Sequence, residues 1–269
     1  MKLNDILKSI ENTTPESLER TGHRRDVLKN IGTKLAAATI PVVASSFFNK
    51  AQAKTTDILS EAIVFALTGT NMLIAFYTKA LNTTGLITGD AVVDFTTILN
   101  HTTAHRDYWN NVLITTGTTP PVDIQYDFTA KNALPKVFAD YTDFLAVAHT
   151  LQDAAVRIYA QAIFNISVNK ALRGDAINIR CTMARHAGHI RLLARNAGTD
   201  IYPWVTNADA NSIVGELIQG YQGDELTMQQ KYEIVNINGS AITMKAATEA
   251  FDEPMGVLAA QAFIAKFTA

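Results

Sequence analysis

Apolar residues recur every three or four positions in four long stretches of the chain, the spacing that aligns side chains along one face of a helix. We predict helices over residues 57–82, 89–116, 137–166 and 169–196. Thr83-Thr84-Gly85 ends the first helix and Gly198 ends the fourth. The connection over residues 117–136 contains Pro120-Pro121 and is too long for a simple up-and-down bundle. The pattern predicts an all-α fold with a long crossover between its second and third helices.

The positions expected to face inward include several polar residues. Those of the first two predicted helices are Ile63, Ala66, Thr70, Leu73, Tyr77, Phe95, Ile98, Thr102, His105, Trp109 and Val112. Those of the last two are Leu145, Ala148, Gln152, Ala155, Tyr159, Ala162, Ile166, Ile179, Met183, His186, Ile190 and Leu193. Periodicity alone therefore predicts a polar cluster inside the bundle, made by Thr70, Tyr77, Thr102, His105, Gln152, Tyr159, Met183 and His186.

The inner positions also repeat along the chain. Thr70 and Tyr77 recur as Gln152 and Tyr159, while Thr102 and His105 recur as Met183 and His186; the offsets are 82, 82, 81 and 81 residues. Offsets this similar indicate that a helix pair is duplicated as a unit.

These residues resemble the desiccation-related, ferritin-like proteins. The resemblance rests on Phe76-Tyr77, His101-Thr102-Thr103-Ala104-His105, Leu151-Gln152-Asp153 with Tyr159, Met183-Ala184-Arg185-His186 and the late Glu249-Ala250-Phe251-Asp252-Glu253-Pro254. It implies a ferritin-like four-helix bundle with a long crossover between helices 2 and 3. It also implies a di-metal centre, held by a Glu from each of two helices and a Glu-x-x-His from each of the other two.

Position by position, the resemblance implies that the four glutamates have been lost. Their places are taken by Thr70, Thr102, Gln152 and Met183, so only His105 and His186 remain as candidate ligands. Four carboxylates balance two divalent cations, whereas this neutral set would leave about four positive charges uncompensated in the interior. We therefore expect no metal cofactor and no catalytic residue. The alternative is a single Zn or Cu ion between the two histidines, with Met183 a poor third ligand.

Without a metal, His105 and His186 are expected to form hydrogen bonds with Tyr77, Tyr159, Gln152 or Thr102, because buried polar groups are nearly always paired. The sequence places several other polar residues away from the interior. His101, His149 and His189 are expected at the flank of the bundle, Asp153 off the inner face, and Asp224, Glu225 and Glu233 in solvent. Cys181 is expected to pack in the fold, with no base beside it.

The charge of the chain is distributed unevenly. Residues 1–53 carry eight basic and five acidic residues, a net charge of +3, and residues 54–269 carry 15 basic and 20 acidic residues, a net charge of −5. An acidic body without a basic run argues against nucleic-acid binding, which depends on neutralising phosphates. The single cysteine excludes an internal disulfide and a thiolate metal cluster.

The first 53 residues are typical of an export signal. His23-Arg24-Arg25-Asp26-Val27-Leu28-Lys29 resembles the twin-arginine motif, an apolar stretch covers residues 31–48, and Ala51-Gln52-Ala53 has a small-x-small cleavage pattern. The alternative is a basic helix with a short membrane anchor, which Lys34 and Pro41 disfavour. We expect a periplasmic or exported protein that contacts the membrane only through this segment, if it is not cleaved.

Three segments follow from this reading: the signal over residues 1–53, the ferritin-like bundle over 54–198 and an irregular tail over 199–269. In the tail, Tyr202-Pro203-Trp204 is expected to anchor the first turn, short helical pieces are possible around residues 212–221, and Pro254 is expected to start a terminal helix that packs on the bundle.

Three functional hypotheses remain. The favoured one is an exported ferritin-like protein that has lost its di-metal centre and acts as a structural, stress-related or binding protein. The second is a metal-binding protein or oxidoreductase that uses His105 and His186 with a non-standard ion. The third is a pairing module that forms a homodimer or joins a related ferritin-like protein with an intact metal centre.

Overall fold

The structure, a computed structural model, describes residues 55–167, 169–207 and 217–269. The predicted export signal lies outside these residues, as do residues 212–216 of the predicted helical stretch at 212–221.

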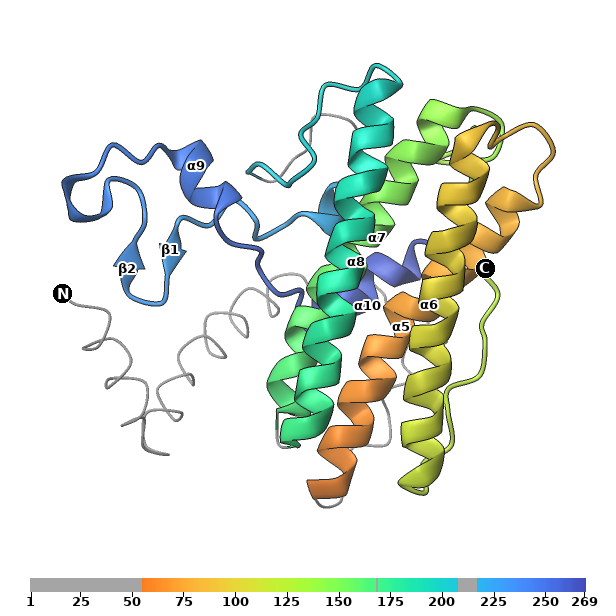
Figure 1. The fold of residues 1–269 in the computed structure, drawn as a ribbon, viewed down its shortest axis with the longest axis horizontal. Coiled ribbons are helices and arrows are strands. Elements are labelled where there is room, and N and C mark those ends of the chain that lie inside the picture. The colour runs from red at the N-terminus through yellow and green to blue at the C-terminus, as the bar shows by residue number, and fades with distance from the viewer. Residues whose placement is uncertain (1–54, 168, 208–216) are drawn as a thin grey trace. The chain divides into compact units, whose positions relative to one another are not determined.

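Four long helices form the body of the described chain (Figure 1): α5 (Thr55–Leu81), α6 (Asp90–Thr115), α7 (Tyr141–Ile166) and α8 (Lys170–Asn196). Helix α5 packs along α6 and α7, and α7 packs along α8, whereas α6 and α8 approach each other at few positions. The predicted four-helix bundle is confirmed. The third helix begins at Tyr141 and not at residue 137, because the Asp140 side chain accepts hydrogen bonds from the backbone N–H groups of Thr142 and Asp143 and caps the helix there.

The crossover between α6 and α7 contacts the end of the chain. Tyr126 forms an antiparallel bridge with Thr268, and the Asp127 N–H donates to the Phe267 carbonyl over 2.7 Å. Phe267 and Phe128 are fully buried. The last residues of the chain therefore form part of the bundle's core.

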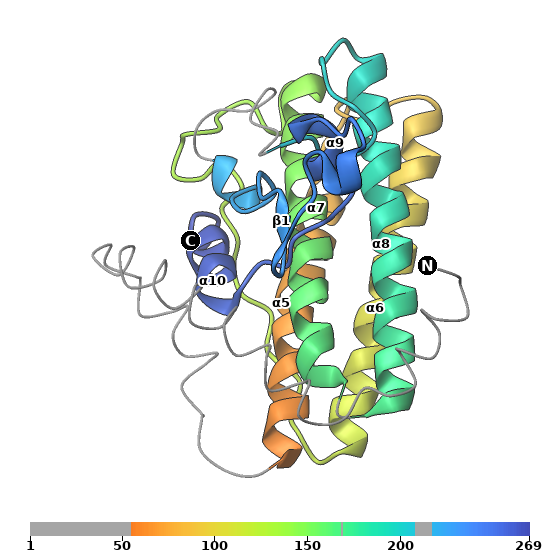
Figure 2. The same cartoon turned by 90° about the vertical axis from the view of Figure 1, so that its left-hand side faces the viewer.

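The predicted inward positions are buried, apart from His105, Val112 and Leu193, which are partly buried. Helix α7 is buried on all sides: every residue from 147 to 159 is inaccessible or nearly so. Periodicity predicted only one buried face for this helix. The tail covers the other face, as Figure 2 shows with α10 beside α7, and the Met255 N–H donates to the Arg157 carbonyl over 3.0 Å.

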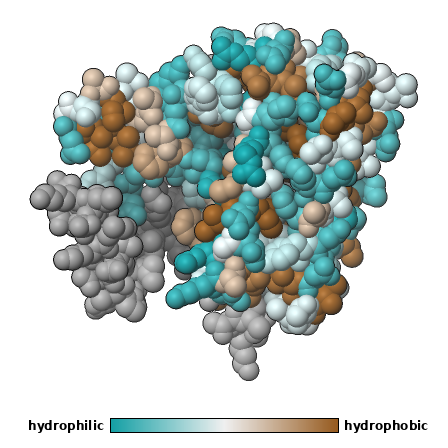
Figure 3. Space-filling model, viewed as in Figure 1, coloured by the Kyte–Doolittle hydropathy of each residue, from teal (hydrophilic) through white to brown (hydrophobic). Residues whose placement is uncertain are grey.

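The tail contains short elements. They are η2 (Ile218–Gly220), the antiparallel pair β1 (Met228–Gln229) and β2 (Tyr232–Glu233), η3 (Ile237–Gly239), α9 (Met244–Glu249) and α10 (Val257–Ala265). The predicted terminal helix begins at Val257 and not at Pro254, since Gly256 is its N-cap residue. Figure 3 shows apolar residues on the part of the tail that carries the hairpin and α9, where Met228, Tyr232 and Met244 are exposed.

One described helix is long and apolar enough to cross a membrane, namely the Ile58–Leu81 part of α5, a feature that the sequence reading missed. More than half of its most apolar stretch is buried inside the bundle, as expected for a core helix, so its composition by itself is weak support for a membrane span.

Candidate functional site

A series of hydrogen bonds passes through Tyr159 at the centre of the bundle and ends at a backbone carbonyl. The Trp109 indole N–H donates to the Tyr159 hydroxyl over 3.1 Å, and this hydroxyl lies 3.0 Å from Thr70 Oγ1. Thr70 in turn donates to the Ala66 carbonyl over 3.2 Å. Because the Thr70 hydroxyl donates to that carbonyl, Tyr159 is the donor to Thr70. Each of the three donor hydrogens in this series therefore has an acceptor.

A second group of hydrogen bonds joins α5, α7 and α8. The Tyr77 hydroxyl donates to Gln152 Oε1 over 2.8 Å, and Gln152 Nε2 donates to the Met183 carbonyl over 3.3 Å. Thr102 donates to the Ile98 carbonyl of its own helix over 2.7 Å. The three polar residues at the presumed glutamate positions are therefore all paired within the protein, and all are fully buried.

These central groups are neutral. Burial raises the pKa of Tyr159 to about 12, with its hydrogen bonds to Thr70 and from Trp109 opposing the shift, and burial raises the pKa of Tyr77 well above its usual range. Both phenols therefore keep their protons at neutral pH. No tyrosinate replaces the negative charge that four glutamates would supply.

The two inner histidines pair differently from the prediction. His186 Nε2 lies 3.1 Å from Nδ1 of His101, and the planes of the two rings are only 16° apart. Among the described residues, neither His105 nor His186 has a hydrogen bond to Tyr77, Tyr159, Gln152 or Thr102, so that expectation is wrong. Tyr77 of α5 instead forms a hydrogen bond with the Gln152 amide of α7, and Tyr159 of α7 forms one with Thr70 of α5.

One nitrogen of each inner histidine is left without a partner. The Nδ1 atoms of His105 and His186 are buried and have no hydrogen bond within the described part of the chain. Burial, and then the neighbouring imidazoles, lower the pKa of each to about 4, with His101 contributing to both and His105 to that of His186. Both rings are therefore neutral at pH 7.

A charged network that the sequence reading missed lies on the other side of α7. His149 is fully buried there, not at the flank, with Nδ1 2.8 Å from the Tyr221 hydroxyl. That hydroxyl donates to Asp153 over 2.8 Å, and Arg191 donates to the same carboxylate oxygen over 2.8 Å. Arg191 also donates to the carbonyls of Tyr202 and Trp204, at 2.9 and 3.0 Å. The predicted anchor of the tail therefore binds through its backbone.

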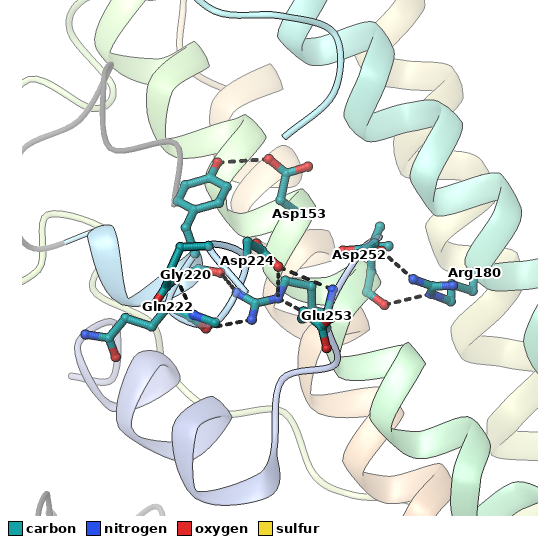
Figure 4. Close-up of polar contacts among 12 residues, drawn as sticks. Asp153, Arg180, Gly220, Gln222, Asp224, Asp252 and Glu253 are labelled. Carbon is teal, nitrogen blue, oxygen red and sulfur yellow. Dashed lines mark hydrogen bonds and ion pairs between the residues drawn. The ribbon is translucent and has the colours of Figure 1, made fainter. Parts of the chain in front are cut away.

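Arg157 of α7 binds a second part of the tail, at residues 220–224 and 253. Its guanidinium donates to the backbone carbonyls of Gly220, Gln222 and Glu253 and lies 3.2 Å from the Asp224 carboxylate. Figure 4 shows these four tail residues close together. Asp224 is 2% exposed, so its predicted place in solvent is wrong. Burial raises the pKa of Asp224 to about 8 despite the opposing charge of Arg157.

A signal for this network does exist in the sequence. Asp153 and Arg157 stand one turn apart in the buried part of α7, on the face away from the bundle centre. Two buried charges there require partners; Asp153 finds one in Arg191 of α8, whereas Arg157 takes its partners from the tail. The flank position expected for His101 and His189 agrees with their exposure, whereas Cys181 is exposed and not packed.

The residues at the centre do not fit a carboxylate-bridged di-metal centre. Fe(II) and Mn(II) require oxygen anions, and the four positions that would supply them hold two hydroxyls, an amide and a thioether. The nearest buried carboxylate in sequence, Asp153, is bound to Arg191 on the far side of α7. Within residues 55–167, 169–207 and 217–269, no three His, Cys, Asp or Glu side chains are grouped as a metal site.

Comparison with known proteins assigns the bundle to a family. No curated protein sequence matches the chain. The ferritin-like domain family matches residues 56–196, a region that contains nearly the whole of α5 to α8 and more than half of the chain. Both the sequence match and the arrangement of the four helices thus lead to the same conclusion: the chain belongs to the ferritin-like domain family.

Proposed function

We propose that this protein is an exported ferritin-like bundle that has lost its di-metal centre and serves as a structural, stress-related or binding protein. The observation that carries the proposal is the hydrogen-bonded neutral cluster at the bundle centre. Thr70, Thr102 and Gln152 are each satisfied by a protein partner, and Met183 is packed with no exposed surface. At these four positions no polar group is left that needs a cation to complete it.

The electrostatic argument supports the same proposal. Two divalent cations would carry four positive charges into a site whose nearest phenols resist ionisation. An uncompensated buried charge costs many kcal/mol, so neutral ligands cannot retain two such ions. Redox chemistry of the di-iron type would therefore have no centre in this bundle.

A second candidate function is favoured by one observation. The unpaired Nδ1 atoms of His105 and His186 are ligand-competent nitrogens in the interior. They support a metal-binding protein or oxidoreductase with a non-standard ion, provided that the ion accepts neutral ligands.

Metal analysis of the full chain tests the loss of the di-metal centre. We expect less than about a tenth of an equivalent of iron or manganese after anaerobic incubation with excess Fe(II) or Mn(II) and gel filtration, because a retained site would be close to stoichiometric. The measurement is inductively coupled plasma mass spectrometry. Two equivalents of either metal per chain would overturn the proposal.

Export is tested separately through the two arginines. In a host with the twin-arginine pathway, the double substitution Arg24→Lys with Arg25→Lys is expected to leave the full-length chain in the cytoplasm, although the charge is unchanged. Lys29→Arg, which also preserves charge but lies outside the arginine pair, is the control and should be exported. Cell fractionation and immunoblotting measure the outcome. Equal periplasmic yield of the double variant and the control would refute export by this route.

A further inference from the structure

Helix α8 concentrates positive charge in a part of the chain that is otherwise acidic. It carries six of the 15 basic residues of 54–269 and one of the 20 acidic residues. Two of its arginines are neutralised by carboxylates, Arg180 by Asp252 and Arg191 by Asp153. The other four basic side chains are exposed and form no ion pair with the described residues: Lys170, Arg173, Arg185 and Arg195. Their charges are therefore available to a partner.

The four free cations lie on the outward face of α8 together with apolar residues. Figure 1 shows α8 in front of α7, along the outside of the bundle. Ile177 and Leu192 are 43% and 41% exposed. Counted at about 100° per residue, they and the four cations lie on the side of the helix away from the buried Met183 and Ile190. The outward face of α8 thus combines positive charge with apolar surface.

An exposed aromatic pair is held against the same face. The rings of Tyr202 and Trp204 stack with their planes 21° apart and are 38% and 50% exposed. The backbone between them passes over α8 at Gly188, 3.2 Å from the place that a Cβ would take there, and Arg191 binds the carbonyls on both sides. The Arg195 guanidinium lies 5.5 Å from the centre of the Tyr202 ring. The tail therefore presents two rings beside the cations of α8 on a fixed backbone.

This combination matches the chemistry of a membrane surface. Tyrosine and tryptophan are enriched where lipid headgroups meet the hydrocarbon, and basic side chains are attracted to anionic headgroups. The acidic remainder of the body would be repelled by the same headgroups, so the uneven charge also orients the protein with α8 toward them. The phosphates of a nucleic acid would attract the four cations as well, but they offer no apolar layer for Ile177 and Leu192.

We propose that the outward face of α8, together with Tyr202 and Trp204, binds the surface of a membrane that contains anionic phospholipids. The contact is peripheral: the four cations pair with lipid phosphates, while the two rings and the two apolar side chains enter the headgroup region. It is separate from the predicted export segment over residues 1–53. It goes beyond the proposed function and does not depend on the state of the bundle centre.

Trp204 reports on this contact directly. The chain has two tryptophans, and Trp109 is fully buried in the bundle. We expect the emission of the full chain to shift to shorter wavelength when it is titrated at low salt with vesicles of phosphatidylglycerol mixed with phosphatidylcholine. The shift should be absent in Trp204→Phe, which assigns it to the exposed ring. It should reverse at about 1 M salt, where the screening length falls to about 3 Å.

A matched pair of double variants tests the role of the cations. Arg173→Gln with Arg185→Gln is expected to need about 25 times more lipid for half of the shift, because each basic side chain near an anionic surface contributes about fivefold to binding. Lys131→Gln with Lys136→Gln removes the same charge from the exposed crossover and should bind like the wild type. Both variants change exposed side chains, so their thermal midpoints should equal that of the wild type.

Four results would overturn the proposal. They are an emission spectrum unchanged by anionic vesicles, an equal shift on vesicles of phosphatidylcholine alone, the same lipid requirement in both double variants, and a shift with duplex DNA but none with vesicles. The last result would assign the face to a different polyanion. None of the four would bear on the loss of the di-metal centre, which is measured by iron and manganese content.

Discussion

Replacing Arg157 with alanine is expected to lower the free energy of unfolding by about 3–5 kcal/mol, the usual effect of removing one partner of a buried ion pair. Arg157 and Asp224 are each 2% exposed, and the guanidinium also binds the carbonyls of Gly220, Gln222 and Glu253. The substitution leaves these acceptors buried without donors. Because the acceptors all belong to the tail, the tail should detach from α7 before the helices separate.

Urea denaturation followed by circular dichroism measures the loss, and limited proteolysis measures release of the tail. Arg106→Ala is the matched control: Arg106 pairs with Asp107 at 2.8 Å, but on the surface, where such pairs contribute about 0–1 kcal/mol. A loss below about 1 kcal/mol for Arg157→Ala, equal to that of the control, would show that the arginine does not hold the tail.

The second large effect is expected from Gln152→Glu, which places one carboxyl at a presumed glutamate position. The side chain would be fully buried next to Tyr77, and no buried cation faces it from the central cluster. Burial of this kind raises a carboxyl pKa by as much as 3–5 units, so the expected loss of stability at pH 7.5 is about 3 kcal/mol. The hydrogen bond from Tyr77 offsets part of the cost of the anion.

The pH dependence of Gln152→Glu has a definite sign. A carboxyl whose folded-state pKa lies above its unfolded value binds its proton more tightly in the folded protein. The variant should therefore approach wild-type stability below about pH 4.3 and lose stability as the pH rises toward the folded-state pKa. Urea unfolding at several pH values measures this, with exposed Gln125→Glu as the control. A variant as stable as the wild type at pH 7.5 would mean that the centre tolerates negative charge.

The sequence predicted the bundle well because the helical period reports which face of a helix is buried. The residues on the inner faces of α5, α6, α7 and α8 followed from spacing alone, and most are fully buried. Spacing does not say which partner a buried polar group chooses. Tyr77 forms its hydrogen bond with Gln152, and Tyr159 forms its own with Thr70. His186 therefore pairs with His101, and His105 Nδ1 has no partner among the described residues.

The tail was predicted poorly because its contacts are remote in sequence. Arg157 binds carbonyls at positions 220, 222 and 253, and nothing in the local pattern of residues 199–269 indicates that path. Asp224 looked like a surface residue because its neighbours are polar, yet it is buried against α7. Two charged residues, Asp153 and Arg157, on the outer face of the third predicted helix were the signal for a covered outer face.

The claim on which the proposed function depends is that the bundle centre is neutral and holds no pair of divalent ions. Its most direct test is anomalous X-ray scattering at the iron edge from crystals of the full chain grown anaerobically with excess Fe(II). We expect no anomalous peak among Thr70, Thr102, Gln152 and Met183. Two strong peaks between His105 and His186, with carboxylate oxygens in contact, would contradict it.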